Sequence, residues 1–480
     1  MIIKYTNKYI KADCYVFIVS NKYKSDIVSI EKNLGITFPK TIFENLTADC
    51  CEIKTIPFDK FSIILGGIGR LKNKCSIQDL NITISKIGNI LANNFSKKIM
   101  VSSFNNDTNY ITNQLEHLIL SIYKFNKYID NKKDIQCIKK EIYFLCDTKH
   151  KNIVNNSILI GNITNVVRDI VNEPPNKTNS IYLETIVKKL FAKSNIQVSI
   201  LNENELKKKG LNLILGVNAG SKFPAKMIIL KNKNKNKNKT TGKKSKIFIG
   251  KGVTFDAGGL NIKLEDFSDM KTDMTGVAIV IGLFMYINKA KIKGNFVGML
   301  PIVENMIDAK SIRPGDIITA YNKKTVEIVD TDAEGRLILA DTISYSNIFN
   351  PEYIVDVATL TGSAGNIFGD LAIVLFGNNT KLNKKMTDSS SIACEKIWEL
   401  PIWDEYIKHT RSQIADYKNY STDIKAGAIM GAAFLHNFIP KNINWIHLDI
   451  GGVSYLSEKS TTLTSGATGY SLRTLINFIL

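Results

Sequence analysis

The chain has 480 residues, enough for more than one domain and for a core that needs neither disulfide bonds nor a structural metal. Its 44% hydrophobic and 22% charged residues are typical of a globular protein and exclude a disordered or fibrous chain. The formal net charge of +19 is compatible with an acidic partner, although eight lysines fall between Lys231 and Lys246 alone.

The cysteines and the apolar runs indicate the cellular compartment of the protein. An odd number of cysteines without CxxC spacing argues against a disulfide framework or a thiolate zinc site, and favours a reducing compartment. The first twenty residues have no small-residue cleavage site and are interpreted as a strand rather than a signal peptide. The longest apolar run, residues 277–287, is too short to span a bilayer. We expect a soluble cytoplasmic protein that makes no membrane contact. The seven cysteines are Cys14, Cys50, Cys51, Cys75, Cys137, Cys146 and Cys394.

The N-terminal third predicts a small α/β domain. Strand-like runs at residues 15–19 and 61–69 alternate with a helix-like stretch at 81–95. The GGIGR segment at Gly66 lacks the third glycine of a nucleotide-binding loop, so a tight turn from strand to helix is the preferred interpretation. We place the domain boundary between residues 155 and 168, giving an N-terminal domain of residues 1–160 and a second domain of residues 161–480.

A repeat of lysine and asparagine lies between two strand-like runs, residues 226–231 and 246–250. The simplest interpretation of such a polar tract is a solvated excursion at the tip of a hairpin. A contact with nucleic acid is the alternative.

Several common catalytic motifs are absent from the sequence. The five histidines form no HExxH motif or close pair, which makes a histidine-based zinc site unlikely on motif grounds. Neither a GxSxG elbow nor a GxxxxGK[S/T] loop occurs, so the usual signatures of serine hydrolases and P-loop NTPases are missing.

Acidic residues instead follow apolar runs in three segments of the second half. Asp256 comes after a strand-like run that also contains Lys251, and Asp273 directly precedes an apolar helical stretch. Asp332 and Glu334 lie between a strand-like and a helix-like run, and on an extended segment residues two apart point to the same side. Open α/β sheets build their sites where such segments converge. The DTD sequence also resembles the DxD of phosphatases, but the threonine expected soon after it is missing.

These segments together resemble the leucyl aminopeptidase family of cytosolic metallopeptidases. The likeness extends from Val167 to the C-terminus, about two thirds of the chain. VDTDAEGRL, residues 329–337, resembles the family signature NTDAEGRL, and further family motifs follow in the family's order. They are GKGVTFDAGG at Gly250, RPGDI at Arg313, DVATLTG at Asp356, AAFL at Ala432, WIHLDIGG at Trp445 and GATG at Gly466.

The resemblance implies an α/β protein in which a small N-terminal α/β domain precedes a larger catalytic α/β domain with a central mixed sheet flanked by helices. It also implies two divalent metal ions, Mn²⁺, Zn²⁺ or Mg²⁺, about 3–4 Å apart. Five residues correspond to the family's metal ligands, with Lys251 binding as a neutral amine because nearby dications lower its pKa. They are Lys251, Asp256, Asp273, Asp332 and Glu334.

Two cations that are not ligands correspond to the family's catalytic pair. Lys263 would donate to the oxyanion formed when a metal-activated water attacks the scissile carbonyl. Arg336 would hold a bicarbonate ion that carries the proton. A metal could also bind the free α-amine of a peptide, which would explain exopeptidase specificity with a leucine-like preference. The residues implied around the substrate are Met270, Thr359, Leu360, Gly362 and Gly451.

The family also suggests assembly and partners. It implies a homohexamer, with the N-terminal domain stabilising the oligomer or acting as an accessory domain. Some bacterial relatives also bind DNA, so DNA binding through a basic surface is the alternative function. The sequence departs from the family at Asp330, which replaces asparagine, at Ala257, which replaces serine, and at Gly451, which replaces alanine. The loop between Lys263 and Asp273 is also about one residue shorter.

Overall fold

The computed structural model describes residues 1–20, 23–69, 76–130, 139–232, 244–264, 267–457, 463 and 465–480. The chain divides into two compact units. The first consists of Met1–Asn165 with Ser457–Gly466, and the second of Val166–Leu456 with Ala467–Leu480. The predicted boundary after residue 160 and this division both fall within helix α5 (Lys151–Asn172).

The first unit is built on a six-stranded sheet with the order β1-β6-β5-β2-β4-β3, in which only β3 runs antiparallel to its neighbour. Its strands are β1 (Ile2–Thr6), β2 (Cys14–Val19), β3 (Ile53–Phe58), β4 (Phe61–Gly67), β5 (Lys98–Ser102) and β6 (Glu141–Leu145). Its helices before α5 are α1 (Tyr23–Leu34), α2 (Lys40–Asn45), α3 (Ile77–Asn93) and α4 (Thr108–Ile122).

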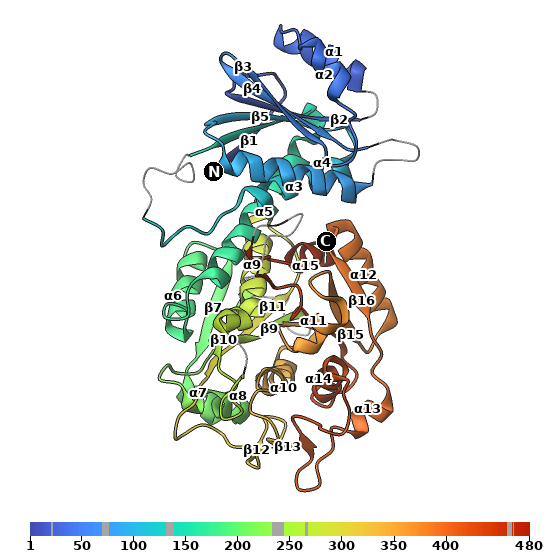
Figure 1. Ribbon diagram of the computed structural model, residues 1–480. Helices are drawn as coiled ribbons and strands as arrows, with labels where there is room; N and C mark the ends of the chain where they lie inside the picture. The colour runs from blue at the N-terminus through green and yellow to red at the C-terminus, as the bar shows by residue number, and fades with distance from the viewer. Residues whose placement is uncertain are drawn as a thin grey trace. The chain divides into compact units, whose positions relative to one another are not determined.

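Helices cover both faces of this sheet, as Figure 1 shows. Successive residues of β2 alternate between two apolar clusters, because side chains of a strand point to opposite faces. Val16 packs into the cluster formed with α3 and α4, whereas Phe17 packs into the cluster formed with α1. The predicted helix at residues 81–95 corresponds to α3. Strand β4 ends at Gly67, inside the GGIGR segment that begins at Gly66. Residues 70–75, which follow this segment's last glycine, lie outside the described residues.

The second unit contains a larger mixed sheet with the order β16-β15-β18-β14-β9-β11-β8-β7, and β10 also pairs with β11. These strands are β7 (Ile196–Leu201), β8 (Lys226–Asn232), β9 (Ser245–Gly250), β10 (Gly252–Asp256), β11 (Phe296–Asn305), β14 (Pro351–Ala358), β15 (Ala372–Gly377), β16 (Lys396–Glu399) and β18 (Asn444–Asp449). The strands β12 (Ile317–Thr319), β13 (Thr325–Glu327) and β17 (Tyr417–Lys418) form a small separate sheet. Two further short strands are β19 (Tyr455–Leu456) and β20 (Gly466–Ala467).

The helices of the second unit after α5 are α6 (Ser180–Phe191), α7 (Glu203–Lys209), α8 (Asn212–Val217), α9 (Thr275–Lys289), α10 (Gly335–Tyr345), α11 (Gly362–Phe368), α12 (Thr380–Ala393), α13 (Asp404–Lys408), α14 (Gly427–His436) and α15 (Leu472–Ile479). Helices α9 and α10 cover opposite faces of the large sheet. Gly298 of β11 lies against Phe284 of α9, whereas its neighbours Val297 and Met299 belong to the apolar cluster that includes α8, α10 and α14. The predicted α/β architecture with a mixed sheet is therefore confirmed.

The predicted hairpin around the Lys/Asn tract is wrong. The flanking runs do form strands, β8 and β9, but the two strands are not neighbours in the sheet. Strand β11 lies between them, antiparallel to β8 and parallel to β9. The apolar β11 supplies a buried partner for both strands, which a local hairpin would not provide. Residues 233–243 of the tract lie outside the described residues.

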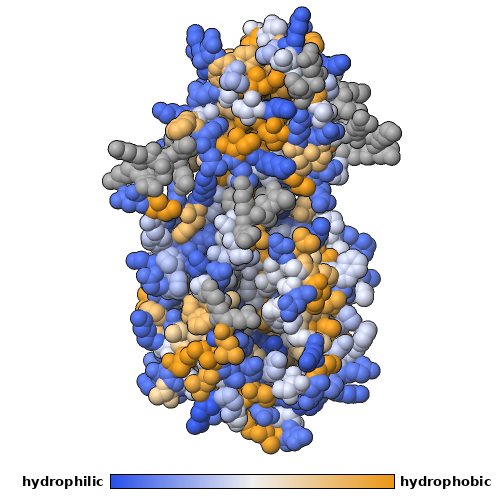
Figure 2. Space-filling model, in the orientation of Figure 1, coloured by the Kyte–Doolittle hydropathy of each residue, from blue (hydrophilic) through white to orange (hydrophobic). Residues whose placement is uncertain are grey.

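One helical segment, Ser268–Lys289, is long and apolar enough to cross a membrane by length and composition. In the fold, 89% of its apolar window is buried, and α9 packs against β9, β11 and β14. It is therefore a core helix of the second unit. On the face drawn in Figure 2, hydrophilic residues are widely spread and hydrophobic ones form small groups between them.

A buried carboxyl joins α10 to two neighbouring segments. Asp341 is fully buried, and its Oδ2 accepts hydrogen bonds from the backbone N–H groups of Leu213 (2.8 Å) and Ile214 (3.3 Å) in α8. Its Oδ1 accepts a third from the N–H of Tyr321 at 2.7 Å. Burial raises the pKa of Asp341 to about 7, although the three N–H donors oppose this shift.

Asp341→Asn should therefore change how stability depends on pH. Because the folded-state pKa of Asp341 lies above its unfolded value of about 4, the free energy of unfolding of the wild-type chain falls as the pH rises between these values. The neutral variant lacks this contribution. The free energy of unfolding is measured with urea at about pH 5 and about pH 7.5. Between these two pH values, that of the wild type should fall by on the order of 2 kcal/mol more than that of the variant. If the two proteins differ in free energy of unfolding by the same amount at both pH values, the raised pKa of Asp341 is contradicted.

Candidate active site

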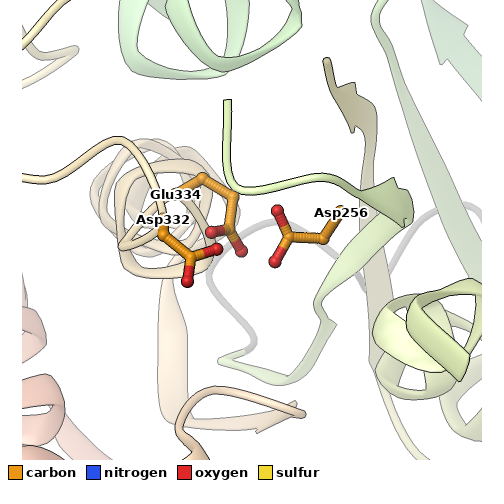
Figure 3. Close-up of side chains that lie close together, drawn as sticks. All are labelled: Asp256, Asp332 and Glu334. Carbon is orange, nitrogen blue, oxygen red and sulfur yellow. The ribbon is translucent and has the colours of Figure 1, made fainter. Parts of the chain in front are cut away.

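Three carboxylates from two segments meet at one end of the large sheet. Asp256 is the last residue of β10, Asp332 lies in the turn after β13, and Glu334 directly precedes α10. Figure 3 shows the three side chains pointing toward one another. One oxygen from each lies within 4.8 Å of the others, so together they could hold a metal ion. The sequence-based expectation that acidic segments converge at a sheet edge is confirmed.

The backbone of the Asp332 segment differs from the predicted extended form. Thr331 and Asp332 lie in a turn, and Glu334 already has helical backbone angles, with φ −77° and ψ −37°. The turn forms because Asp330 Oδ1 accepts a hydrogen bond from the N–H of Asp332 at 2.8 Å. An asparagine oxygen could accept the same bond, so the carboxylate at Asp330 preserves this turn.

Lys251 and Asp273 form the buried part of the site. Lys251 lies between β9 and β10, and its Nζ contacts Asp273 Oδ1, Glu334 Oε1 (3.1 Å) and the carbonyl oxygen of Thr359 (2.7 Å). Thr359 Oγ1 also donates to Asp273 Oδ1 at 2.8 Å. One oxygen of Asp273 and one of Glu334, Oδ2 and Oε2, are buried without a hydrogen-bond partner among the described residues.

Lys263 forms the more open part of the site. Its Nζ lies 2.8 Å from Asp256 Oδ2 and 2.5 Å from Asp332 Oδ1. The Lys263 side chain is 22% exposed, compared with 2% for Lys251. Of the two lysines, Lys263 is thus the one that a molecule from solvent could reach.

The pKa values follow from this crowding of buried carboxylates. Burial raises the pKa of Asp332 to about 7, and the charges of Asp256 and Glu334 add to the shift. Burial also raises the pKa values of Asp273 and Glu334. For Lys251 and Lys263, burial alone would lower the pKa, but the surrounding carboxylates outweigh it and raise both values. Such clustered, mutually perturbed groups are typical of functional sites.

A polar network that the sequence analysis missed holds Asp256 in place. Asn305, the last residue of β11, donates from Nδ2 to Asp256 Oδ1 at 2.9 Å and to the carbonyl of Thr331 at 3.1 Å. Thr331 and Asn261 exchange hydrogen bonds between side chain and backbone in both directions. Asn305 could have been found from the sequence, because it ends a strand-like apolar run, and Asp256 was selected on the same pattern.

Arg336 lies apart from the carboxylate contacts. Its side chain is buried on the first turn of α10, and Nη1 donates to the backbone carbonyl of Asn419 at 3.0 Å. Its Nε has no hydrogen-bond partner among the described residues. Burial lowers the pKa of Arg336, while Glu334, Asp330 and Asp449 act in the opposite direction.

The predicted substrate residues fall into two groups. Thr359 contacts the site directly through Lys251 and Asp273, and Leu360 and Gly362 follow it at the start of α11. The carboxylate of Asp449 accepts from the N–H groups of Leu360 (3.2 Å) and Gly451 (3.1 Å), so it braces this loop. Met270 lies half-buried in a 3₁₀ segment, Ser268–Met274, that also carries Asp273.

Gly451 has little room for a side chain. A Cβ built there would lie 2.4 Å from the carbonyl oxygen of Thr361 and 3.2 Å from Asp449 Oδ1. The methyl of an alanine would therefore press on the backbone of the neighbouring loop rather than point into open space. Gly362 is the opposite case, because a Cβ there would meet no atom within 4 Å.

Comparison with known proteins gives consistent matches. Residues 165–476 match the family model described as the cytosol aminopeptidase family, catalytic domain. A probable cytosol aminopeptidase of Buchnera aphidicola subsp. Baizongia pistaciae is 39% identical over 370 residues, covering 75% of this chain and 72% of that protein. A probable cytosol aminopeptidase of Rickettsia canadensis is 33% identical over 482 residues, covering 95% and 94%.

The solved structure of the bottromycin maturation enzyme BotP in complex with Mn has the same fold. It superposes with a TM-score of 0.86 at 23% identity, covering 98% of this chain and 99% of that chain. The likeness therefore includes the N-terminal unit as well as the part that the family model matches.

Gly335→Ala should disturb the site through Lys251. A Cβ at Gly335 would lie 2.2 Å from Lys251 Cε, and the buried lysine has little space to move. Overpacking of this kind costs about 1–3 kcal/mol, so thermal melts should show a clear loss of stability. Gly362→Ala is the matched control, since both glycines are the first residue of a helix and the control meets open space. Equal melting temperatures for the two variants would show that Lys251 is not confined.

Proposed function

This chain belongs to the cytosol aminopeptidase family of metallo-exopeptidases, and on that basis we propose that it releases leucine-like residues from the N-termini of peptides by two-metal hydrolysis. The observation that carries the proposal is the cluster of Asp256, Asp332 and Glu334, whose oxygens lie within 4.8 Å of one another. Hydrolysis of an amide bond requires a strongly activated water, and a carboxylate cluster that binds divalent ions is one way to provide it.

The residues present fit a pair of divalent metal ions. Four carboxylates, Asp256, Asp273, Asp332 and Glu334, face two lysines, which leaves a formal charge of −2. Two of the carboxylate oxygens are buried without partners in the part of the chain that the structure describes, which is costly unless a cation or hydrogen-bond donor satisfies them. We propose that these carboxylates and Lys251 hold two ions of Mn²⁺, Zn²⁺ or Mg²⁺. When bound, the ions would supply Lewis acidity and lower the pKa of a water molecule.

Lys263 is proposed to stabilise the charge that develops on the carbonyl oxygen. It is a cation at the more exposed side of the cluster, and Asp256 and Asp332 restrain its Nζ. A donor held in place before the reaction needs little reorganisation as negative charge develops, which is the basis of oxyanion stabilisation.

Arg336 is proposed to hold a bicarbonate ion that accepts and returns the proton. The guanidinium presents planar N–H donors, a geometry that suits the oxygens of a small planar anion. One edge is fixed by the carbonyl of Asn419, while Nε remains free among the described residues. A buried donor without a partner supports a bound anion at this point.

We further propose that substrate binding combines the bound metal ions with the loop after β14. Two divalent ions would more than offset the formal charge of −2, so the N-terminus of a peptide would bind to a metal ion as a free amine, which an N-blocked peptide lacks. Met270, Thr359, Leu360, Gly362 and Gly451 would surround the first residue of the peptide. A cytoplasmic location, which agrees with relatives named cytosol aminopeptidases, belongs to the same proposal, as does assembly as a homohexamer. The DNA-binding alternative depends on the net charge, and residues 233–243 of the basic tract lie outside the described residues.

The activity itself can be tested with two matched substrates. The purified protein should hydrolyse leucyl amide when Mn²⁺, Zn²⁺ or Mg²⁺ is added, and should lose the activity on chelation. N-acetyl-leucyl amide should not be hydrolysed, because it lacks the free amine. Cleavage of both substrates at similar rates would refute an exopeptidase, and activity that survives complete chelation would refute the metal requirement.

The division between ligands and catalytic cations predicts two kinds of variant. Lys263→Ala should lower kcat on the order of 10²–10³-fold, the usual cost of removing one preorganised oxyanion donor, while the metal content stays near that of the wild type. Asp332→Ala should lose metal as well as activity. Elemental analysis of dialysed protein separates the two results. Loss of metal from Lys263→Ala would show that Lys263 is required for metal binding.

A further inference from the structure

Asn419 makes an unusual number of contacts for a residue outside the predicted site. It directly follows β17 and is 1% exposed. Its side-chain Oδ1 accepts from the N–H groups of Val329 (2.8 Å) and Asp330 (3.3 Å). Its Nδ2 donates to the carbonyl oxygens of Asp330 (2.6 Å) and Ala333 (3.4 Å). The backbone of residues 329–333 therefore wraps around one amide group.

The wrapped segment carries the carboxylates of the site. Asp332 lies within it, and Glu334 follows the carbonyl group of Ala333 that Asn419 contacts. The side chain of Asp332 is held by Lys263 but is 31% exposed, so the backbone of its turn must supply much of its orientation. The amide of Asn419 reaches this turn from a segment 86 to 90 residues later in the chain and fixes it at both ends.

The backbone of Asn419 serves a second element of the site. Its carbonyl oxygen accepts from Arg336 Nη1 at 3.0 Å, and its own N–H donates to the carbonyl of Glu327 at 3.0 Å. The same residue thus sets the position of the carboxylate turn through its side chain and the position of the guanidinium through its main chain. A displacement of Asn419 would move both.

We propose that Asn419 is a positioning residue that couples the geometry of the Asp332 and Glu334 turn to the orientation of Arg336. This inference rests on the proposed function. It assigns to Asn419 the role of keeping the carboxylates arranged for metal ions and the guanidinium arranged for an anion at the same time. Substitution of a residue that contacts the ligands rather than the metal commonly lowers metal affinity or activity by about 10- to 100-fold.

Only an amide matches this environment in both directions. The oxygen end faces two N–H donors, and the nitrogen end faces two carbonyl acceptors. Aspartate has nearly the same shape but places a second acceptor against the carbonyls of Asp330 and Ala333. Asn419→Asp should therefore push the turn apart, whereas Asn419→Ala removes the contacts without adding repulsion.

Asn232 offers a matched control at the other end of the same sheet. Its Nδ2 donates to the carbonyl of Gly294 at 2.6 Å, and its Oδ1 accepts from the N–H of Phe296 at 2.8 Å. Phe296 begins β11, whereas Asn305 at the other end of that strand contacts Asp256. Asn232→Asp thus makes the same chemical change in a similar backbone bridge away from the site.

The test compares Asn419→Asp, Asn419→Ala and Asn232→Asp in the Mn²⁺-loaded protein. Dialysis with elemental analysis gives the Kd for Mn²⁺, and leucyl amide hydrolysis at saturating Mn²⁺ gives kcat and KM. Asn419→Asp should raise the Kd about 10- to 100-fold and lower kcat with little change in KM, and Asn419→Ala should act in the same direction. Asn232→Asp should lower the melting temperature but leave the Kd and kcat unchanged.

Wild-type Kd and kcat values in a folded Asn419 variant would overturn the proposal. Equal losses in Asn419→Asp and Asn232→Asp would also overturn it, because the effect would then come from general destabilisation. If Asn419→Asp does not fold, Asn419→Ala supplies the same comparison. The Kd measurement needs no turnover, so an inactive wild-type protein that still binds Mn²⁺ would refute the proposed function without removing the test of Asn419.

Discussion

The structure of the second unit depends on keeping four carboxylates close together, three of them buried and the fourth, Asp332, partly exposed. Like charges at this separation repel one another, and burial raises the free energy of each charged form. The two lysines offset part of this cost. Part of it remains, because one oxygen each of Asp273 and Glu334 is buried with no hydrogen-bond partner among the residues described. A site with this residual charge favours cations, so the same repulsion that opposes folding provides affinity for metal ions.

The scaffold meets this requirement by taking the four carboxylates from three differently anchored segments, with Asp332 and Glu334 on the same one. Asp256 is fixed by a strand and by Asn305, Asp273 by a short helix and Thr359, and Asp332 by a turn that Asn419 supports. Because no single loop carries all four side chains, none of them can move away without breaking hydrogen bonds elsewhere. Rigid placement is what allows like charges to remain adjacent.

Sequence reasoning located the carboxylates because each follows or precedes an apolar run, and the family motifs added Lys251, Lys263 and Arg336. Local patterns also predicted α3, and the family resemblance implied the mixed sheet. Sequence reasoning failed where the outcome depends on distant partners. The pairing of β8 and β9 with β11 is set by a strand at least 50 residues later. No pattern near Asn419 indicates that its amide supports a turn 86 to 90 residues earlier. The turn at Asp332 was missed because the short side chain of Asp330 bonds to the backbone in place of a strand partner.

The insertion of β11 between β8 and β9 sets a lower limit on the connection between them. The end of β8 and the start of β9 both lie at the start of β11, two strand spacings apart, which is about 10 Å. About three extended residues could cover that distance. The sequence provides twelve, residues 233–244, so most of this connection is not required by the sheet. Its length and composition can change during evolution without cost to the sheet, and a repetitive tract can expand or shrink there.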